Sequence, residues 1–298
     1  MPWPSALLAC AGTLRHNPSH SPNEAHGFLM DRTAEPAPLL ESVLVRGTRP
    51  LVYVARLWRL LAEAVWWIVI LSLRSPRRLR RVETFRQMVE CGVNSMPILF
   101  LIIFLIGLIL AMQSAYQLDK FGVTSLVAAL VGVTITREVG PLITGIIVSA
   151  RVGAAITAEL GTMVVSEEIM ALETMAIRPV PFLVVPRLIA LVVMVPCLTI
   201  LADCVGLLGG FCVGVGNLDI NAGAYLYNTI EGLENQDIVT GLIKSVGFAI
   251  VIALVSTHEG LSVSGGPEGV GTATTRSVVM SILLIIITDL IFTIIFYL

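Results

Sequence analysis

The chain has 298 residues, of which 56% are hydrophobic and only 13% are charged, with a formal net charge of −2. A soluble domain carries about 25% charged residues, so this composition excludes an ordinary soluble protein. Together with apolar runs near 20 residues long, it predicts an all-α polytopic membrane protein. No basic domain is present, so we expect no binding to nucleic acid. The five cysteines form no CxxC pair, and we expect no metal site.

The first segment, residues 1–45, is rich in Pro, Ser, His and Ala and lacks sustained periodicity, so we expect a disordered tail. Ala6–Ala11 is too short for the apolar core of a signal peptide, and no Lys or Arg precedes it. Acidic residues such as Glu24 and Glu35 argue against a chloroplast transit peptide. A transit peptide stays possible, and these residues do not decide where the protein is located.

Residues 46–90 are expected to form an interfacial helix followed by a cytosolic arginine-rich segment. Arg56, Arg59 and Glu63 lie on one face of the apolar stretch 51–73, and its tryptophans are typical of the head-group level. We expect an amphipathic helix in the interface rather than a spanning helix. The arginines that follow mark the cytoplasmic side. They are Arg74, Arg77, Arg78, Arg80, Arg81 and Arg86.

Residues 91–298 are expected to form a membrane domain with five transmembrane helices, which places the N-terminus in the cytoplasm and the C-terminus in the periplasm. The expected spans are 96–118, 123–162, 182–216, 238–257 and 277–298. The second is too long for one straight crossing, so Gly140-Pro141 is expected to kink or break it. The glycines between 206 and 216 are expected to allow close helix contact. Residues 217–237 carry no Lys or Arg and are expected to form an outer loop.

Ionisable residues inside the expected spans are the first candidate functional site. They are Arg137, Glu138, Arg151, Glu159, Asp203, Lys244 and Asp289. Each central charge costs roughly 2.5–3.5 kcal/mol, so these residues should avoid lipid. On a straight helix, the first four lie within an arc of about 140°. Glu138, Lys244 and Asp289 come from three spans and are the strongest candidates for a shared interior network. Arg137, Arg151 and Glu159 are further candidates for this polar network or for a lipid cavity. Mutual neutralisation without a transport role is the alternative.

Small residues recur at every fourth position of the second span. They are Gly145, Ser149, Gly153, Thr157 and Gly161. Such a ridge lets two helix backbones approach closely. Packing within one protomer and a seam between two protomers both fit this pattern. No internal repeat is found, which argues against the secondary transporters built from inverted repeats.

A short amphipathic helix is expected on the cytosolic side at residues 166–177. Ser166 can cap the helix, and Glu167 and Glu168 suit its first turn. Ile169, Leu172 and Ala176 are expected to line one face. A helix in this position suits contact with a soluble motor protein, and an ordinary connector is the alternative. The candidate contact residues are Ser166, Glu167, Glu168, Ile169, Leu172, Glu173 and Ile177. No GxxxxGK[ST] loop is present, so an ATPase would be a separate subunit.

The segment TREVGPLITGIIVSARVGAAITAELGTMVVSEEIMALETMAIRPVPFLVVPR resembles the MlaE (YrbE) permeases of MCE-linked ABC transporters. Their patterns are REL-GP, GR-G-A-AE-GTM, TEQI-ALE-M and DP---L--PR, and LIKSVGFAI and GTATTRSVV continue the resemblance. It covers roughly residues 50–298, and residues 1–45 have no counterpart. The chain departs from the family at Val139, where Leu is usual, at Ser149, where Gly is usual, and at Arg178, where Asp is usual.

The resemblance implies a homodimeric permease that moves phospholipid or a related hydrophobic molecule between membranes. It also implies a location in the bacterial inner membrane, with the chloroplast inner envelope as the lesser alternative. A separate ABC ATPase, which would bind ATP and Mg, is expected to dock on residues 166–177. An MCE-domain protein and a STAS-domain subunit are further expected partners. This chain would hold no cofactor and no catalytic residue. Two alternatives stay open: an ion-coupled secondary carrier that uses Glu138, Lys244 and Asp289 as relay groups, and a non-transporting membrane scaffold.

Overall fold

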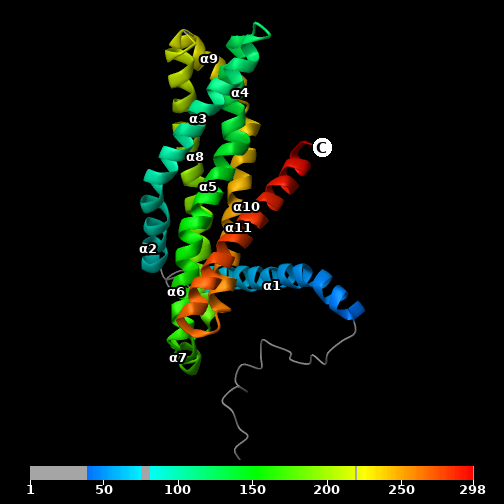
Figure 1. Ribbon diagram of the computed structural model, residues 1–298. Coiled ribbons are helices and arrows are strands. Elements are labelled where there is room, and N and C mark those ends of the chain that lie inside the picture. Colours follow the sequence, from blue (N-terminus) through cyan, green and yellow to red (C-terminus); the bar gives the residue numbers. More distant parts are fainter. Residues whose placement is uncertain (1–38, 75–80, 219, 298) are drawn as a thin grey trace, which may run out of the picture. The chain divides into compact units, whose positions relative to one another are not determined.

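The computed structural model describes residues 39–74, 81–218 and 220–297. All elements assigned in these ranges are helices, which confirms the expected all-α fold (Figure 1). The chain divides into two compact units, residues 1–52 and 53–298, and the second unit contains the long apolar helices. Helix α1 (Leu39–Arg74) begins within the expected N-terminal tail. The first 38 residues of that tail lie outside the described residues.

Five helical stretches among the described residues are long and apolar enough to cross a membrane, in agreement with the sequence. They are Val82–Asp119, Val127–Val165, Val180–Gly216, Asn235–Leu261 and Gly266–Phe296. Helix α1 is not one of these stretches. Its second half packs on the membrane unit, where Tyr53 donates a 3.0 Å hydrogen bond to Glu259 and Leu57 packs against Val255. Its position in the interface stays a prediction.

The first span contains helix α2 (Arg81–Gly92), a short 3-10 turn η2 (Val93–Ser95) and helix α3 (Met96–Asp119). The 24 residues of α3 extend about 36 Å at about 1.5 Å per residue. The hydrocarbon core of a bilayer is about 30 Å thick, so α3 alone is long enough to cross it. Helix α2 is therefore not needed for the crossing, and we expect it at or beyond the head-group level.

The second span is continuous through Gly140-Pro141, so a break is wrong there, and a kink stays a prediction. It contains α4 (Val127–Thr134), a π-helical turn η4 (Ile135–Val139), α5 (Gly140–Val148), a second π-helical turn η5 (Ser149–Gly153) and α6 (Ala154–Val165). Proline lacks the N–H that an α-helix needs. The π-helical turn η4 accommodates the missing N–H of Pro141. In this turn the Gly140 N–H donates to the Ile135 carbonyl, one residue further back than in an α-helix.

Pro141 also explains a close approach between the second and fourth spans. In the π-helical register the Thr136 carbonyl would accept from the residue-141 nitrogen, which carries no proton. This oxygen instead faces Gly241, where a Cβ atom would collide with it. Glycine at this position therefore lets the fourth span lie directly against the widened turn.

The third span begins with a π-helical turn, η6 (Val180–Val184), and continues as α8 (Val185–Gly216). Helix α8 packs against α2, α3, α5 and α10. The predicted close contact at its glycines is confirmed, because a Cβ atom at Gly209 would collide with the Phe104 carbonyl oxygen of α3.

The predicted outer loop contains an additional helix, α9 (Ala222–Gly232). Its N-cap residue Asn221 accepts a 2.9 Å hydrogen bond from the Gly223 N–H. Tyr225 is buried against the glycine face of α8 and in edge contact with Phe211. Burial raises the pKa of Tyr225 to about 12, so its phenol stays neutral at physiological pH.

The last two spans are α10 (Asn235–Leu261) and α11 (Gly266–Tyr297). Glu234 and Asp237 form a capping box, which starts α10 three residues before the expected Ile238. Helix α11 starts eleven residues before the expected Ser277, directly after a turn in which Gly265 has a φ of 91°. The loop between these helices is therefore much shorter than expected. Helices α7 and α9 lie at opposite ends of the spans (Figure 1).

Candidate functional site

The side chain of Lys244 joins three spans. Helix α10 carries this lysine, and its ammonium nitrogen lies 2.6 Å from Glu138 of η4 and 3.0 Å from Asp289 of α11. It also donates a 2.9 Å hydrogen bond to the hydroxyl of Thr293 on α11. The structure thus brings together the three charged residues that the sequence placed in one network. Together with Thr293 they form the Lys244 cluster.

The Lys244 cluster is sealed at its centre and open at one side. The Lys244 side chain has no exposed surface, while Asp289 is 18% and Glu138 is 34% exposed. The Asp289 oxygen that faces the ammonium makes no hydrogen bond of acceptable angle, so this contact is mainly Coulombic. One cation between two carboxylates leaves a formal charge of −1. Glu138 is the member of the cluster that a ligand outside the protein can reach most easily.

Thr293 was missed by the sequence analysis, although its spacing could have indicated it. It lies one helical turn after Asp289, on the same face of α11. Its hydroxyl lies 2.9 Å from the Asp289 carbonyl oxygen and 3.4 Å from Glu138, and it accepts from the lysine. A neutral hydroxyl in an apolar span carries little signal by itself, so only the contact with Lys244 reveals its place.

The other predicted charges do not join this cluster. Arg137 reaches Asp237 at the start of α10, with 3.6 Å between the nearest charged atoms. Glu159 forms a 2.8 Å ion pair with Arg187 of α8. Arg151 is exposed, and no ion pair is assigned to it within the described ranges. The four charged residues of the second span were expected to share one arc of the helix, but they do not form a single site.

The main reason for this separation is distance along the second span, because residues 138, 151 and 159 lie about 20 Å and about 12 Å apart on a helix that rises about 1.5 Å per residue. The pair of π-helical turns adds a change of rotation. A constant rotation of about 100° per residue holds only for an α-helix. The turns η4 and η5 each widen the helix, so residues after them rotate away from the positions that a straight helix predicts. Arg137 and Glu138 both face α10 but contact positions 237 and 244, two helical turns apart.

Asp203, the remaining predicted charge, is buried in α8 against Gly140. No hydrogen bond is assigned to its Oδ1 atom in the described part of the chain. A Cβ atom at Gly140 would collide with this oxygen. Asp203 therefore lies against Gly140, the residue that directly follows η4, but it is not part of the Lys244 cluster.

The ridge of small residues packs inside the chain. Gly145 and Gly153 face Phe248 and Ile252 of α10. Thr157 donates to the Ser256 carbonyl of α10 or the Ser277 hydroxyl of α11, at 3.1 Å and 2.8 Å. Ser149 and Gly161 are also buried. This face is covered by the chain's own helices, so packing within one protomer accounts for the ridge.

The helix predicted at residues 166–177 is shorter, because α7 covers only Glu168–Thr174. Ser166 is not its N-cap residue. Glu167 takes that position in a left-handed conformation with a φ of 60°, and the Ser166 hydroxyl donates to the Glu168 carboxylate at 3.0 Å. Ile169 and Leu172 pack against the core as expected. Ala176 lies beyond the helix and is exposed, so its expected place on the apolar face is wrong.

The C-terminal end of α7 is closed by a Schellman motif. The Ile177 N–H donates to the Leu172 carbonyl at 3.0 Å, and the Ala176 N–H donates to the Glu173 carbonyl at 2.9 Å. Ala176 has a φ of 59°, a conformation that favours glycine. Glu167, Glu168 and Glu173 remain exposed. The result is a short acidic helix that is held at both ends and presents its outer face to the surroundings.

Comparison with known proteins connects this geometry with a transport family. A family model described as Permease MlaE matches residues 84–295. A probable ABC transporter permease protein of Rickettsia prowazekii is 40% identical over 212 residues, covering 71% of this chain and 82% of the relative. The intermembrane phospholipid transport system permease protein MlaE of Haemophilus influenzae is 34% identical over 215 residues, with the same two coverages.

A plant relative is more distant. The chloroplastic protein TRIGALACTOSYLDIACYLGLYCEROL 1 of Arabidopsis thaliana is 31% identical over 215 residues, covering 72% of this chain and 61% of the relative. The family match runs from α2 to the end of α11 and includes the whole Lys244 cluster and α7. The chain is therefore a multi-pass membrane protein that belongs to the MlaE permease family.

Proposed function

We propose that this permease subunit moves phospholipids or related hydrophobic molecules between membranes and is driven by separate ATPase subunits that dock on residues 166–177. The observation that carries the proposal is α7. This helix has only seven residues, none of them buried, and is nevertheless closed by ordered turns at both ends. Isolated helices this short are marginal in water, so a preformed acidic helix is well suited to receive a partner. The Haemophilus relative named for phospholipid transport supports the cargo class.

The proposed orientation places α7 in the cytoplasm of a bacterium. Helix α7 joins the second and third spans, so it lies on the same side of the membrane as α2, which begins the first span. The arginines at positions 74–86 adjoin α2 and mark the cytoplasmic side. Helix α9 joins the third and fourth spans and lies on the periplasmic side. The membrane is then the inner membrane, as the bacterial ABC permease relatives suggest.

In the proposed mechanism, two copies of the chain enclose a lipid cavity that opens toward the α9 side. ATP and Mg bind to the ATPase subunits, whose closure pushes the two α7 helices together and narrows the cavity. The lipid passes between this cavity and an MCE-domain protein on the periplasmic side, and a STAS-domain subunit accompanies the ATPase. The chain itself makes and breaks no covalent bond.

The Lys244 cluster has two tasks in this mechanism. Its ion pairs connect η4, α10 and α11, so the three helices move as one body when α7 is pushed. Glu138 is partly exposed and offers a polar contact to a lipid head group. Charged residues inside a membrane protein typically mark such substrate pathways.

The docking assignment is tested by the double variant Glu167→Lys/Glu168→Lys. Both side chains are exposed, so the protein should fold normally, but the acidic surface of α7 becomes basic. We expect the purified complex to lose its ATPase subunits and ATP-dependent lipid transfer between vesicles. The matched control is Asp119→Lys/Glu231→Lys, which makes the same charge change at exposed residues of the opposite side. Full retention of the ATPase and of lipid transfer in the α7 variant would contradict the proposal.

A further inference from the structure

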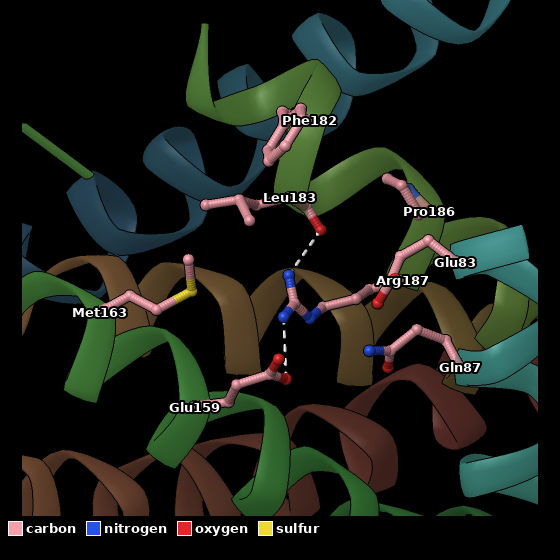
Figure 2. A pocket seen from close by; sticks show the side chains of 8 residues that line it. All are labelled: Glu83, Gln87, Glu159, Met163, Phe182, Leu183, Pro186 and Arg187. Carbon is pink, nitrogen blue, oxygen red and sulfur yellow. Dashed lines mark hydrogen bonds and ion pairs between the residues drawn. The ribbon is translucent and has the colours of Figure 1, made fainter. Parts of the chain in front are cut away.

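A pocket of about 180 Å³ lies where α2, α6 and the beginning of the third span meet (Figure 2). It is separate from the Lys244 cluster. Four polar side chains and four apolar residues line it. They are Glu83, Gln87, Glu159, Met163, Phe182, Leu183, Pro186 and Arg187. The polar residues come from three elements that are far apart in the sequence, so only the folded chain creates this combination.

Arg187 provides the positive wall of the pocket. Its side chain is 5% exposed, donates to the Leu183 carbonyl at 2.9 Å and pairs with Glu159 at 2.8 Å. Figure 2 shows the guanidinium group among the other lining side chains. The Nε–H group has no hydrogen-bond acceptor in the described part of the chain. A buried donor on a charged group is costly to leave unpaired, so this atom calls for an acceptor from a ligand.

Glu83 and Gln87 provide the opposite polar wall. They lie one turn apart on α2 and therefore face the same way. Gln87 is 5% exposed, and within the described ranges no hydrogen bond is assigned to the side chain of either residue. Two carboxylates and one guanidinium give the pocket a formal charge of −1. A simple anion would be repelled by Glu83, and a simple cation would leave the Arg187 Nε–H unpaired.

The pocket lies at the depth of the lipid head groups. Helix α3 alone is long enough to cross the hydrocarbon core, so we expect α2 to lie outside it. The face of α2 that bears Val82, Phe85 and Val89 is nevertheless exposed and apolar, as expected of a helix that contacts lipid. The second and third spans, with 39 and 37 residues, also exceed the core thickness, and the pocket lies at their α7 ends.

We propose that this pocket binds the ammonium–phosphate head group of a zwitterionic phospholipid from the leaflet on the α7 side. The ammonium group pairs with Glu83, and the phosphate accepts from the Arg187 Nε–H and the Gln87 amide. A volume of about 180 Å³ holds about six waters at about 30 Å³ each. That is enough for a head group but not for acyl chains, which stay outside the pocket. The proposal goes beyond the proposed function, because it concerns a second lipid site and requires no transport.

The test uses the full-length protein without its partners, in detergent, and measures retained lipid by native mass spectrometry. Lysophosphatidylethanolamine and lysophosphatidylglycerol are offered at equal concentration, because both carry the phosphate but only the first carries the ammonium. We expect the wild type to prefer the first by about tenfold, and Glu83→Gln to remove this preference. Arg187→Lys, which keeps the charge but loses the Nε–H, should weaken binding of both lipids. Melting temperatures establish that each variant is folded.

The matched control is Glu90→Gln, the same change at an exposed residue of α2 outside the pocket, and it should bind like the wild type. Equal retention of the two lipids by the wild type overturns the proposal, as does an unchanged preference in Glu83→Gln. Soluble phosphoethanolamine is the third ligand. If it displaces the lipid at equal concentration, the site takes a free zwitterion and the assignment to a membrane lipid is overturned. Loss of docking at α7 would change none of these results, so the two proposals fail independently.

Discussion

At the scale of single residues, Lys244 can be buried because three oxygen atoms lie within 3.0 Å of its ammonium nitrogen. A charge at the centre of a membrane span costs roughly 2.5–3.5 kcal/mol on insertion scales. The two carboxylates would each carry such a cost without the lysine between them. Removal of one member of a buried ion pair costs about 3–5 kcal/mol because it leaves an uncompensated charge, whereas removal of all the charges leaves none.

This contrast predicts the behaviour of two variants. Lys244→Met should lower the free energy of unfolding by about 3–5 kcal/mol, since Glu138 and Asp289 lose their shared counter-ion. The triple variant Lys244→Met/Glu138→Gln/Asp289→Asn should recover most of this loss. Unfolding in detergent micelles measures both changes. Lys120→Met serves as the control, because this lysine is exposed.

The same variants separate a structural from a transport role of the Lys244 cluster. The folded triple variant lacks every charge of the cluster. We expect it to assemble with the ATPase but to transfer lipid more slowly than the wild type, because Glu138 no longer offers a charged contact. Normal lipid transfer by the triple variant would mean that the cluster only holds the helices together.

At the scale of secondary-structure elements, α7 ends in a turn that its sequence does not favour. Its C-terminal turn requires a left-handed residue, and the chain has Ala176 there instead of the usual glycine. The left-handed conformation costs roughly 1–2 kcal/mol for a residue with a Cβ atom. The helix nevertheless ends there, because Ile169 and Leu172 are anchored on the core and fix where the chain must turn back.

The variant Ala176→Gly should therefore stabilise α7. We expect the amides of residues 171–177 to exchange with deuterium several-fold more slowly, since about 1 kcal/mol corresponds to about fivefold in the local opening equilibrium. Ala171→Gly is the control, because glycine inside a helix costs about 1 kcal/mol and should speed exchange. Faster exchange in Ala176→Gly would show that strain at this residue does not limit the stability of α7.

At the scale of the whole molecule, five crossings place α7 and the turn between α10 and α11 on one side and α9 on the other. In the proposed orientation, the arginines near the α2 end place the first of these sides in the cytoplasm. Alkaline phosphatase is active only after export, so it reports the side on which it is attached. Fusions that end at Asn221 should be active, and fusions that end at Ser264 should be inactive. The reverse pattern would contradict the orientation, and activity at both positions would contradict the number of spans.

Local properties of the sequence were sufficient to predict the membrane class and the five spans, while the family was indicated by the resemblance of its motifs. Hydropathy is a sum over neighbouring residues, and about 20 apolar residues specify a span wherever they occur. The joint network of Glu138, Lys244 and Asp289 was also predictable, because the cost of a charge in lipid forces such residues to find each other. The ends of the helices were less predictable, since capping turns and glycines with positive φ shifted the starts of α10 and α11.

Tertiary structure alone decided which charges meet. Glu138 contacts a lysine 106 residues away, while its neighbour Arg137 reaches a different turn of the same helix. The π-helical turns changed the rotation of the second span, and no periodic pattern in the sequence records such a change. The pocket around Arg187 and the docking of α9 through Tyr225 likewise depend on helices that become neighbours only after folding. Sequence determined how often and where the chain crosses the membrane, because insertion is local, whereas packing between distant helices determined its sites.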